Sequence, residues 1–442
     1  MIIEFTVGNF RSFKEPVTLS MVAAKLKARD PKININNTIR VNDKLTLLTS
    51  SAIYGANASG KSNLVHALRF MRSFVLSSSR ETQVAETIEV QPFRLSTETA
   101  NSPSLFEVTF IVEDMQYRYG FEANNERIIS EWLFFTPKQR EARLFIRQED
   151  RIECARVFKE GSGLEDKTRP NALFLSVAAQ FNGPIATSIL IWFRKLGIIS
   201  GLSDIGYRSY TLEQFEKDDF RAEIINRVKA LDLGIQDVRI DKPADVKESA
   251  KPSISISVAI PNDNIAELLQ ERLEKVFGAG NVHPMSIQTI HKKYDADGLP
   301  VGEETFDLGV NESEGTQKLF FLTGPLINTL TTGRVLVIDE MEARMHPLIT
   351  RSVIELFNSL DTNPKRAQLI FTTHDTNLLS KNFFRRDQIW FIEKDHYEAS
   401  HLYSLAELKV RNDASFESDY IEGRYGAIPF IGNLRQIILG EK

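Results

Sequence analysis

Eight residues near the start of the chain have the types and spacing of a loop that cradles phosphates. The segment is Gly55-Ala56-Asn57-Ala58-Ser59-Gly60-Lys61-Ser62, which fits G-x-x-x-x-G-K-[ST] at every fixed position. In such a loop, backbone N–H groups at the start of a helix point at the phosphates. We expect Lys61 to reach the β- and γ-phosphates and the Ser62 hydroxyl to bind Mg²⁺. A chance loop of small residues before a helix is the alternative. The residues expected to contact nucleotide are Gly55, Asn57, Ala58, Ser59, Gly60, Lys61, Ser62 and Asn63.

The residues on either side of this loop have the patterns of a strand and a helix. Leu47, Leu48 and the run Ala52-Ile53-Tyr54 are apolar and predict one short buried strand. Residues 63–71 carry apolar side chains at helical spacing. A strand, a glycine-rich turn and a helix N-terminus are the elements that this kind of anion site requires.

A second apolar strand, much later in the chain, ends in two acidic residues. Val335-Leu336-Val337-Ile338 is followed by Asp339 and Glu340. We expect Asp339, at the carboxyl end of the strand, to hold Mg²⁺ directly or through water. Glu340 is placed to act as a general base on a water molecule aimed at the γ-phosphate. This pattern is only moderately specific alone, and the phosphate loop upstream strengthens it.

A third apolar strand, residues 369–373, delivers a histidine. Because this strand follows the Asp339 strand, we expect His374 to reach the same sheet edge and to sense the γ-phosphate. A histidine of the core or of an ordinary loop is the alternative.

A serine and a glycine open a further helix, expected at residues 317–330. The hydroxyl of Ser313 and the free N–H groups around Gly315 would form a second anion site at the helix start. One nucleotide does not need two cradles from one chain. We therefore expect this cradle to close on the γ-phosphate bound by another subunit. An ordinary serine-capped helix start is the alternative.

The order of these motifs resembles the ABC-type ATPase heads of the SMC and RecF group. Asn9-Phe10-Arg11-Ser12-Phe13 also resembles the Asn-Phe-Arg start of those heads. The resemblance covers about residues 1–95 and 305–395. It is closest to the bacterial OLD-like and abortive-infection ABC ATPases, including the RloA, AbiL, PtuA and PARIS AriA groups. Their usual ending resembles residues 387–391 and 420–429.

The resemblance implies that ATP and Mg²⁺ are the cofactors and that ATP is hydrolysed. Lys61, Glu340 and His374 would be the catalytic residues, with Glu340 as the hydrolytic glutamate and His374 as the switch histidine. Ser62 and Asp339 would hold the metal ion.

The same resemblance assigns weaker roles to five other residues. Ser313 and Gly315 would be the signature that acts on a partner's nucleotide, although the transporter-type Leu and double Gly are absent. Gln91 is the candidate for a Q-loop residue that contacts Mg²⁺, with a surface glutamine as the alternative. Arg11 would contact nucleotide or form a structural salt bridge, and His346 would act across a dimer interface or cap the next helix.

Composition limits the partners and the compartment. The chain of 442 residues has a formal net charge of −5, so charge does not indicate DNA binding, although a local basic strip is compatible with it. The single cysteine, Cys154, excludes an internal disulfide and fits a reducing cytoplasm. The N-terminus lacks a signal-peptide pattern. The apolar run 189–193 falls short of the about 20 residues that span a bilayer, so we expect a cytoplasmic protein without a membrane partner.

The order of patterns predicts an α/β fold, a P-loop NTPase of ABC-type head with a mixed or parallel sheet. The head is expected at residues 1–95 and 305–442, an antiparallel β layer at 96–170, and an inserted, mostly helical lobe at 171–304. Alternating residues around 106–121 predict a hairpin in the β layer. Within the lobe, the predicted elements are helices at 171–199, 212–231 and 265–277, a loop at 242–252 and a strand at 254–258.

Together these patterns predict an ATPase that works as a head-to-tail dimer or as a larger assembly of dimers. By the resemblance, it would be the sensor or regulatory subunit of an anti-phage defence system and would control a separate effector, such as a nuclease or toxin. Two alternatives stay open: a RecF/SMC-like DNA repair or maintenance ATPase that clamps DNA, and a scaffold that turns over ATP slowly. About 68 residues follow His374, fewer than the about 100 of an additional domain, so we expect any effector to be another chain.

Overall fold

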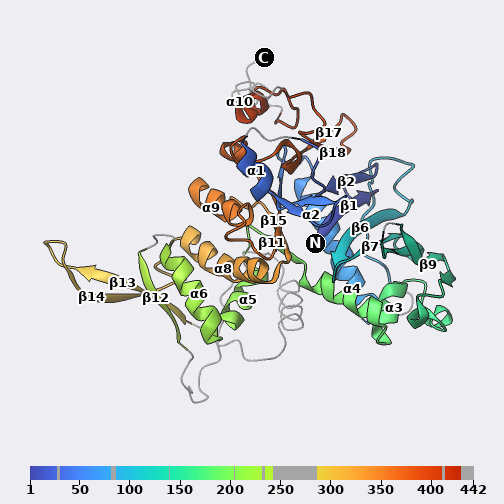
Figure 1. Cartoon of the computed structure of the whole chain (residues 1–442), viewed down its shortest axis with the longest axis horizontal. Helices are drawn as coiled ribbons and strands as arrows, with labels where there is room; N and C mark the ends of the chain where they lie inside the picture. Colours follow the sequence, from blue (N-terminus) through green and yellow to red (C-terminus); the bar gives the residue numbers. More distant parts are fainter. Residues whose placement is uncertain are drawn as a thin grey trace, which may run out of the picture. The chain divides into compact units, whose positions relative to one another are not determined.

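The computed structural model describes residues 1–26, 30–80, 86–138, 140–203, 205–230, 234–241, 286–410 and 414–429. The chain divides into two compact units. The larger unit comprises Met1–Phe220 and Lys318–Lys442, and the smaller unit is Arg221–Gln317. Figure 1 shows the elements in colours that follow the sequence.

A six-stranded sheet in the larger unit carries the predicted phosphate loop. Its first five strands are parallel and the last pairs antiparallel. The parallel strands are short, and most of their residues are apolar, as expected for strands that are covered on both faces. Because β16 (Gln368–Thr372) lies between β15 (Val335–Asp339) and β5 (Ser50–Tyr54), the carboxyl ends of these three strands meet at one edge. In sheet order the strands are β11 (Gly197–Ser200), β15 (Val335–Asp339), β16 (Gln368–Thr372), β5 (Ser50–Tyr54), β17 (Ile389–Lys394) and β18 (Ser400–Ser404).

The apolar run before the phosphate loop forms two strands rather than the one predicted. β4 (Thr46–Leu48) pairs with β3 (Thr38–Arg40), whereas β5 joins the six-stranded sheet. The change of partner occurs at Thr49, whose N–H donates to the carbonyl of Asn37 at 3.1 Å. A buried apolar run does not reveal such a change of pairing, because both strands are apolar.

A seven-stranded antiparallel sheet forms the predicted β layer. The predicted hairpin is confirmed, with Val112 paired to Met115 across a turn in which Glu113 and Asp114 both have positive φ. The layer also contains β1 and β2 from the start of the chain. In sheet order the strands are β10 (Arg151–Cys154), β9 (Ala142–Gln148), β8 (Ile128–Thr136), β7 (Met115–Ala123), β6 (Ser104–Val112), β1 (Ile2–Gly8) and β2 (Val17–Ser20).

Helix α2 (Lys61–Ser77) contributes to a core that contains residues of both sheets. Its Phe74 ring lies 5.6 Å from Phe121 of the antiparallel sheet, centroid to centroid. Val337 and Ile370 of the parallel sheet belong to the same cluster. Burying each such side chain contributes about 1.5–3 kcal/mol, so this shared core fixes the helix that begins at the phosphate loop.

The segment 171–200 differs from its predicted place in the inserted lobe. It forms α3 (Phe174–Gln180), α4 (Pro184–Lys195) and β11, and all three belong to the larger unit. The unit boundaries therefore fall at Phe220 and Gln317. The physical reason is that Ile189 and Phe193 of α4 are buried in the main core.

Membrane-spanning potential is weak in the described part of the chain. None of its helices is, on its own, long and apolar enough to cross a bilayer. The pair α3 and α4, which bends by 107°, passes that test only by length and composition.

The predicted helix 212–231 is divided into two helices. α5 (Ile205–Phe215) ends before α6 (Asp218–Ala230), and the N–H of Lys217 donates to the carbonyl of Gln214 in the turn between them. Asp218 and Asp219 then begin the second helix, where negative charge is favourable.

The described residues of the smaller unit are not only helical. Most of α6 belongs to this unit, together with a three-stranded antiparallel sheet. The predicted loop at 242–252, strand at 254–258 and helix at 265–277 lie outside the described residues. The strands of the sheet, in order, are β12 (Ile235–Asp241), β13 (Ser286–Tyr294) and β14 (Pro300–Asp307).

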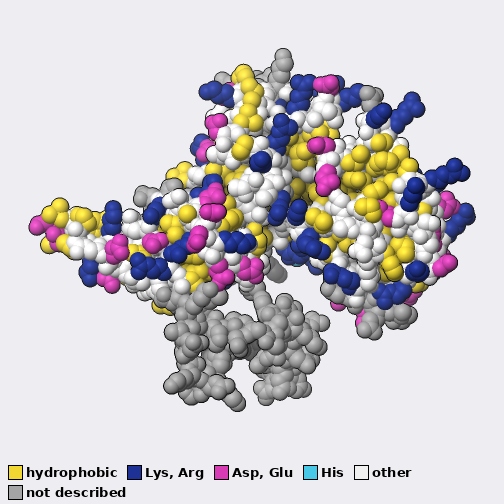
Figure 2. All heavy atoms as spheres, turned by 60° about the horizontal axis from the view of Figure 1, so that its bottom comes forward, with side chains coloured by type: hydrophobic (Ala, Val, Ile, Leu, Met, Phe, Trp, Pro, Cys, Tyr) yellow, Lys and Arg dark blue, Asp and Glu magenta, His cyan; other side chains and the backbone are white. Residues whose placement is uncertain are grey.

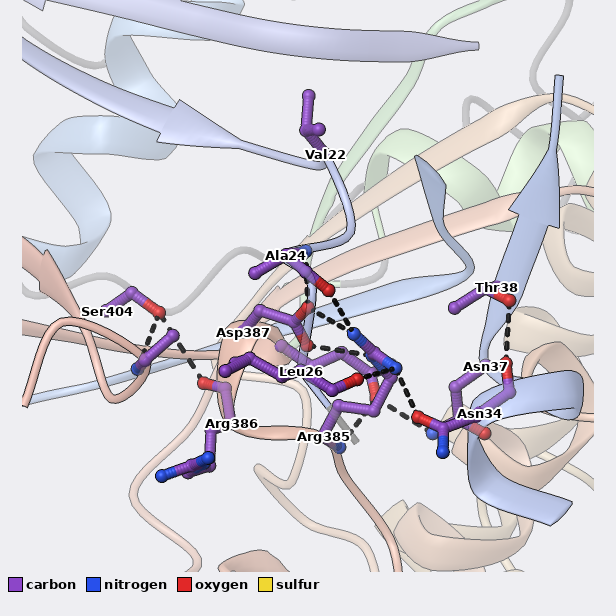
Figure 3. Close-up of polar contacts among 12 residues, drawn as sticks. Val22, Ala24, Leu26, Asn34, Asn37, Thr38, Arg385, Arg386, Asp387 and Ser404 are labelled. Atoms are coloured by element: carbon purple, nitrogen blue, oxygen red, sulfur yellow. Dashed lines mark hydrogen bonds and ion pairs between the residues drawn. The ribbon is translucent and has the colours of Figure 1, made fainter. Parts of the chain in front are cut away.

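A buried ion pair fixes the chain just before β17. Arg385 and Asp387 are each 5% exposed, and the guanidinium meets the carboxylate through two bonds of 2.9 and 2.7 Å. The Asp387 carboxylate also accepts from the N–H of Ala24 at 2.8 Å, and Arg385 donates to Asn34 (Figure 3). This network ties the N-terminal segment to the sheet. The remaining described helices are α1 (Pro31–Asn36), α8 (Glu314–Thr332), α9 (Pro347–Phe357), α10 (Phe416–Ile421) and the short 3-10 turns at Lys159–Gly161, Glu165–Lys167, Thr376–Leu378 and Arg386–Gln388.

Candidate nucleotide site

The predicted phosphate loop joins the end of β5 to the start of α2. Gly60, the N-cap of α2, has φ +115°, and no side chain caps the helix. A Cβ at Gly60 would meet the hydroxyl of Ser12 at 2.8 Å, so only glycine fits there. No side chain caps the first N–H groups of the 17-residue helix α2. Uncapped N–H groups at a helix start are the arrangement that binds an anion.

Lys61 is buried beneath this loop, with 5% of its surface exposed. Its ammonium donates to the carbonyls of Gly55 at 2.7 Å and Ala56 at 2.9 Å. Burial lowers the Lys61 pKa to about 8, against the opposing influence of Glu342, Glu340 and Asp339. The lysine therefore keeps its charge at neutral pH and lies close enough to the three acids to interact with them.

Asp339 and Glu340 end β15 beside the loop. The hydroxyl of Thr372, on the neighbouring strand, donates to the Asp339 carboxylate at 2.6 Å and accepts from the N–H of Glu340 at 2.7 Å. Glu340 has φ +51°, a left-handed conformation that is uncommon outside glycine. Burial, then Asp339 and Glu342, raise the Glu340 pKa, which makes its carboxylate a better base.

His374 follows β16 and reaches the same edge as the acids. Its backbone N–H donates to a carboxylate oxygen of Glu342 at 2.5 Å. Burial and the nearby Lys61 charge lower the pKa of the His374 ring, so the neutral imidazole is favoured. The structure thus brings Lys61, Asp339, Glu340 and His374 to one edge of the parallel sheet.

Arg11 lies at the start of α2, as its predicted contact with nucleotide requires. One guanidinium nitrogen is 3.5 Å from the side-chain oxygen of Asn63, and the amide of Asn63 donates to Ser12 at 2.7 Å. Gln91 accepts the backbone N–H of Arg11 at 2.7 Å through its carbonyl, while its own side chain is exposed. The Q-loop role of Gln91 therefore stays a prediction.

Ser313 caps the start of α8. Its hydroxyl accepts from the N–H of Thr316 at 3.1 Å, and Gly315 lies in the first turn of the helix. Both residues belong to the smaller unit. His346 is likewise an N-cap, because its ring accepts from the N–H of Leu348 at the start of α9. Its predicted role across a dimer interface is not needed to explain its position.

Several buried polar atoms around the phosphate loop have no hydrogen-bond partner in the described part of the chain. They are the Nε of Arg11, the hydroxyl of Ser59, one carboxylate oxygen of Glu342 and one of Asp375. Buried polar atoms nearly always have a partner, and exceptions call for a reason. These four atoms fit a polar ligand at the uncapped helix start, and further unpartnered atoms of the described residues belong to other residues, such as Arg127, Thr350 and Asn358.

The family to which the chain belongs follows from its sequence. A family model described as "AAA domain, putative AbiEii toxin, Type IV TA system" matches residues 50–380, from β5 to beyond His374. The chain belongs to this family. It has the P-loop NTPase fold, of the α/β class that the sequence predicts.

Solved structures similar to the chain include SMC head domains. The head domain from Thermotoga maritima is 12% identical, with a TM-score of 0.34, over 92% of this chain and 99% of that one. The Smc head domain of Pyrococcus furiosus, bound to the C-terminal domain of ScpA, is 14% identical, with a TM-score of 0.33, over 96% and 98%. No curated protein matches the chain. The family assignment rests on the family model.

The residues at the sheet edge fit Mg²⁺ with a nucleotide. The predicted ligands are the Ser62 hydroxyl, in the first turn of α2, and the Asp339 carboxylate. The described residues contain no group of three or more His, Cys, Asp or Glu arranged for a metal ion. Mg²⁺ commonly takes one or two protein oxygens and completes its shell with phosphate and water. When bound, it would neutralise charge on the β- and γ-phosphates.

The sequence patterns did not predict three residues that lie next to the site. Gly201, after β11, donates its N–H to the carbonyl of Asp339 at 2.6 Å, and a Cβ there would meet the carbonyl of Glu340. Glu342 holds the His374 backbone, and the buried Lys318 donates to carbonyls after β15. A glycine two residues after the apolar pair Ile198-Ile199 was the one available signal.

Proposed function

We propose that this chain binds MgATP at the loop Gly55–Ser62 and hydrolyses it. Lys61 contacts the β- and γ-phosphates, and Ser62 and Asp339 hold the metal ion. Glu340 takes a proton from the attacking water, and a ring N–H of His374 donates to the γ-phosphate. The observation that carries the proposal is the meeting of these side chains at one sheet edge, where burial raises the Glu340 pKa.

The hydrolysis test uses Glu340→Gln beside the wild-type chain. Gln keeps the size of the side chain and removes its ability to accept a proton. We expect phosphate release to fall by at least about 100-fold, the scale of a lost general base. ATP binding, measured with a fluorescent ATP analogue, stays within threefold. Phosphate release at the wild-type rate would contradict the role of Glu340.

We further propose that each nucleotide is shared between two copies of the chain. Ser313 opens α8 next to a loop whose Val310 is 81% exposed. An exposed apolar side chain beside a helix N-terminus suits a surface that a second copy covers. ATP bound at the loop of one copy would then contact Ser313 and the N–H groups of α8 in the other.

A mixing experiment tests the shared site. Lys61→Ala inactivates the phosphate loop of one protein, and Ser313→Arg blocks the signature of another. Each variant alone should be inactive. A mixed dimer contains one intact site, so mixing equal amounts should restore up to about a quarter of the wild-type turnover. Lack of any recovery, in proteins shown to form mixed dimers, would mean that each chain hydrolyses ATP alone.

In the cell, we propose that the ATPase is the sensor or regulatory subunit of a defence system and controls a separate effector. The support is the description of its family, which names a toxin of a toxin–antitoxin system. The effector would be the product of a neighbouring gene, a nuclease or a toxin. The surface charge does not indicate a DNA-binding surface. On the face shown in Figure 2, Lys and Arg side chains are interspersed with Asp and Glu.

Co-purification tests this role. The neighbouring gene product should bind the chain, and Glu340→Gln, which holds ATP, should change the amount bound by severalfold. Duplex DNA should leave the ATPase rate within twofold. If the neighbouring gene product does not bind and plain duplex DNA stimulates hydrolysis severalfold, the result contradicts the defence role and supports a DNA-clamping role.

A further inference from the structure

We infer that Lys318 and Glu342 are positioning residues through which helix α8 sets the catalytic edge of its own chain. The inference rests on the proposed shared site and deepens it. The start of α8 would bind the partner's ATP, while Lys318, farther along the same helix, contacts the loop that follows Glu340. One helix would then contribute to both nucleotide sites of a dimer.

The first link is a buried lysine. Lys318 is 5% exposed, and its ammonium donates to the carbonyl of Met341 at 3.0 Å and to that of Ala343. These two carbonyls lie on either side of Glu342 in the chain. A buried ammonium is costly unless its protons are bonded, so these contacts hold the loop tightly against the helix.

The second link is the carboxylate between the two anchored carbonyls. One oxygen of Glu342 accepts from the backbone N–H of His374, and the other is buried without a hydrogen-bond partner among the described residues. Glu342 is also the largest of the charges that favour the ionised form of Lys61 and of Lys318. Glu342 therefore interacts with Lys61, with Lys318 of α8 and with the backbone of His374.

The third link is the strained residue at the start of the loop. Glu340 has φ +51°, and its N–H is held by Thr372. Its neighbour Met341 is held on both sides, because its N–H donates to the carbonyl of Thr372 at 3.1 Å and its carbonyl accepts from Lys318. An uncommon backbone conformation persists only where its surroundings fix it. Lys318 is part of what fixes it.

The helix connects these contacts to the signature. Ser313 lies five residues before Lys318, about 7.5 Å along an α-helix. A small movement of α8 on binding a partner's γ-phosphate would therefore reach Glu340 and His374 of the same chain. A misplacement of about 1 Å at a catalytic group can cost about 100-fold in rate.

The experiment places Lys318→Met on one side of the mixed dimer at a time. The single intact site takes its phosphate loop, Glu340 and His374 from the Ser313→Arg protein, and its Ser313 from the Lys61→Ala protein. We expect Lys318→Met in the Ser313→Arg protein to lower the restored turnover at least tenfold. In the Lys61→Ala protein it should change turnover less than threefold.

The other placements and controls make the result decisive. Glu342→Gln should act from the same side as Lys318→Met, and Lys318→Arg, which keeps donors, should recover part of the loss. Lys365→Met, at an exposed lysine, should have no effect from either side. An equal loss from both sides, a loss only from the Lys61→Ala side, or no loss at all would overturn the inference. If Lys318→Met does not fold, Glu342→Gln decides by the same placement.

If the proposed shared site is wrong, the mixing experiment gives a different result. In that case the mixture of the two parent proteins shows no recovery. The inference is then measured in the otherwise wild-type chain, where Lys318→Met should lower kcat at least tenfold and leave the KM for ATP within threefold. A change in KM alone would show that the lysine serves binding rather than the position of Glu340.

Discussion

Two clusters of buried charge in the larger unit differ in how completely their polar atoms are bonded. The first, the β-layer cluster, consists of Tyr119, Glu131 and Arg147. Glu131 is fully buried and accepts from the Tyr119 hydroxyl at 3.0 Å and from the N–H groups of Phe174 and Leu175 at the start of α3. Arg147, 1% exposed, donates to four backbone carbonyls.

The second, the phosphate-site cluster, consists of Lys61, Asp339, Glu340, Glu342 and His374. Here a carboxylate oxygen of Glu342 is buried without a hydrogen-bond partner among the described residues. The Glu340 pKa is raised by burial and by two neighbouring acids. These acids repel one another at the sheet edge, with Lys61 as the compensating charge.

This difference in hydrogen bonding indicates that the β-layer cluster stabilises the fold and that the phosphate-site cluster is suited to binding a ligand. Glu131 and Arg147 lie 3.8 Å apart, and both are hydrogen-bonded to backbone groups at or just before the start of α3, so the loss of either should affect folding. A cluster of repelling acids with unsatisfied atoms costs stability and persists where a ligand or a reaction uses it. Substitutions in the two clusters should therefore separate stability from activity.

The largest effect is expected from Arg147→Met in the β-layer cluster. This change leaves the Glu131 carboxylate buried without its cation, which costs about 3–5 kcal/mol of unfolding free energy. Urea unfolding followed by fluorescence measures it. Turnover per folded molecule should stay within twofold. Adding Glu131→Gln should recover part of the stability, because the amide oxygen can still accept from α3. Full stability in the single variant would break the comparison.

A second prediction concerns Glu340→Gln in the phosphate-site cluster. Turnover should fall at least about 100-fold, whereas the melting temperature of the nucleotide-free protein should not fall. The sign follows from the raised Glu340 pKa: the folded protein disfavours the ionised carboxylate, and a neutral amide removes that cost. Thermal unfolding monitored beside phosphate release checks both. A drop in melting temperature would show that this cluster is structural too.

Gly201→Ala should have a smaller effect on the same edge. Its Cβ would meet the carbonyls of Asp339 and Glu340, so the end of β15 must shift. We expect kcat to fall about tenfold, or about 1.4 kcal/mol in barrier, with ATP affinity within threefold. Gly206→Ala is the matched control, since a Cβ there meets nothing within 4 Å. Equal kcat values for the two variants would contradict the contact.

The smallest predicted effect is a pH dependence of nucleotide capture. The Lys61 pKa is lowered to about 8, so the ammonium loses its proton, and its attraction for phosphate, as pH rises through that value. At pH 8 kcat/KM for ATP should be about twofold below its plateau and should decline further above it. Because the Lys318 pKa is also lowered to about 8, Lys318→Arg is the control. If kcat/KM for ATP still declines at alkaline pH in that variant, the decline is due to Lys61.

Much of the site could be predicted because its residues come from short local patterns. The loop around Lys61 and the acids after β15 each follow a strand, and strands of a parallel sheet end at a common edge. His374 was placed by the same rule. Lys318 and Glu342 could not be predicted, because nothing local distinguishes them from surface charges. Their roles come from contacts between segments more than twenty residues apart.

The sequence by itself determined the phosphate loop, the order of the motifs and the α/β fold class. These depend on local features: apolar spacing, and glycine where the backbone at Gly60 must adopt a positive φ. Only the tertiary structure decided that residues 197–200 pair with β15, where Gly201 meets Glu340, and that the unit boundaries fall at Phe220 and Gln317. It also decided which buried charges are bonded. Burial and partners arise from packing between distant segments, which no local pattern specifies.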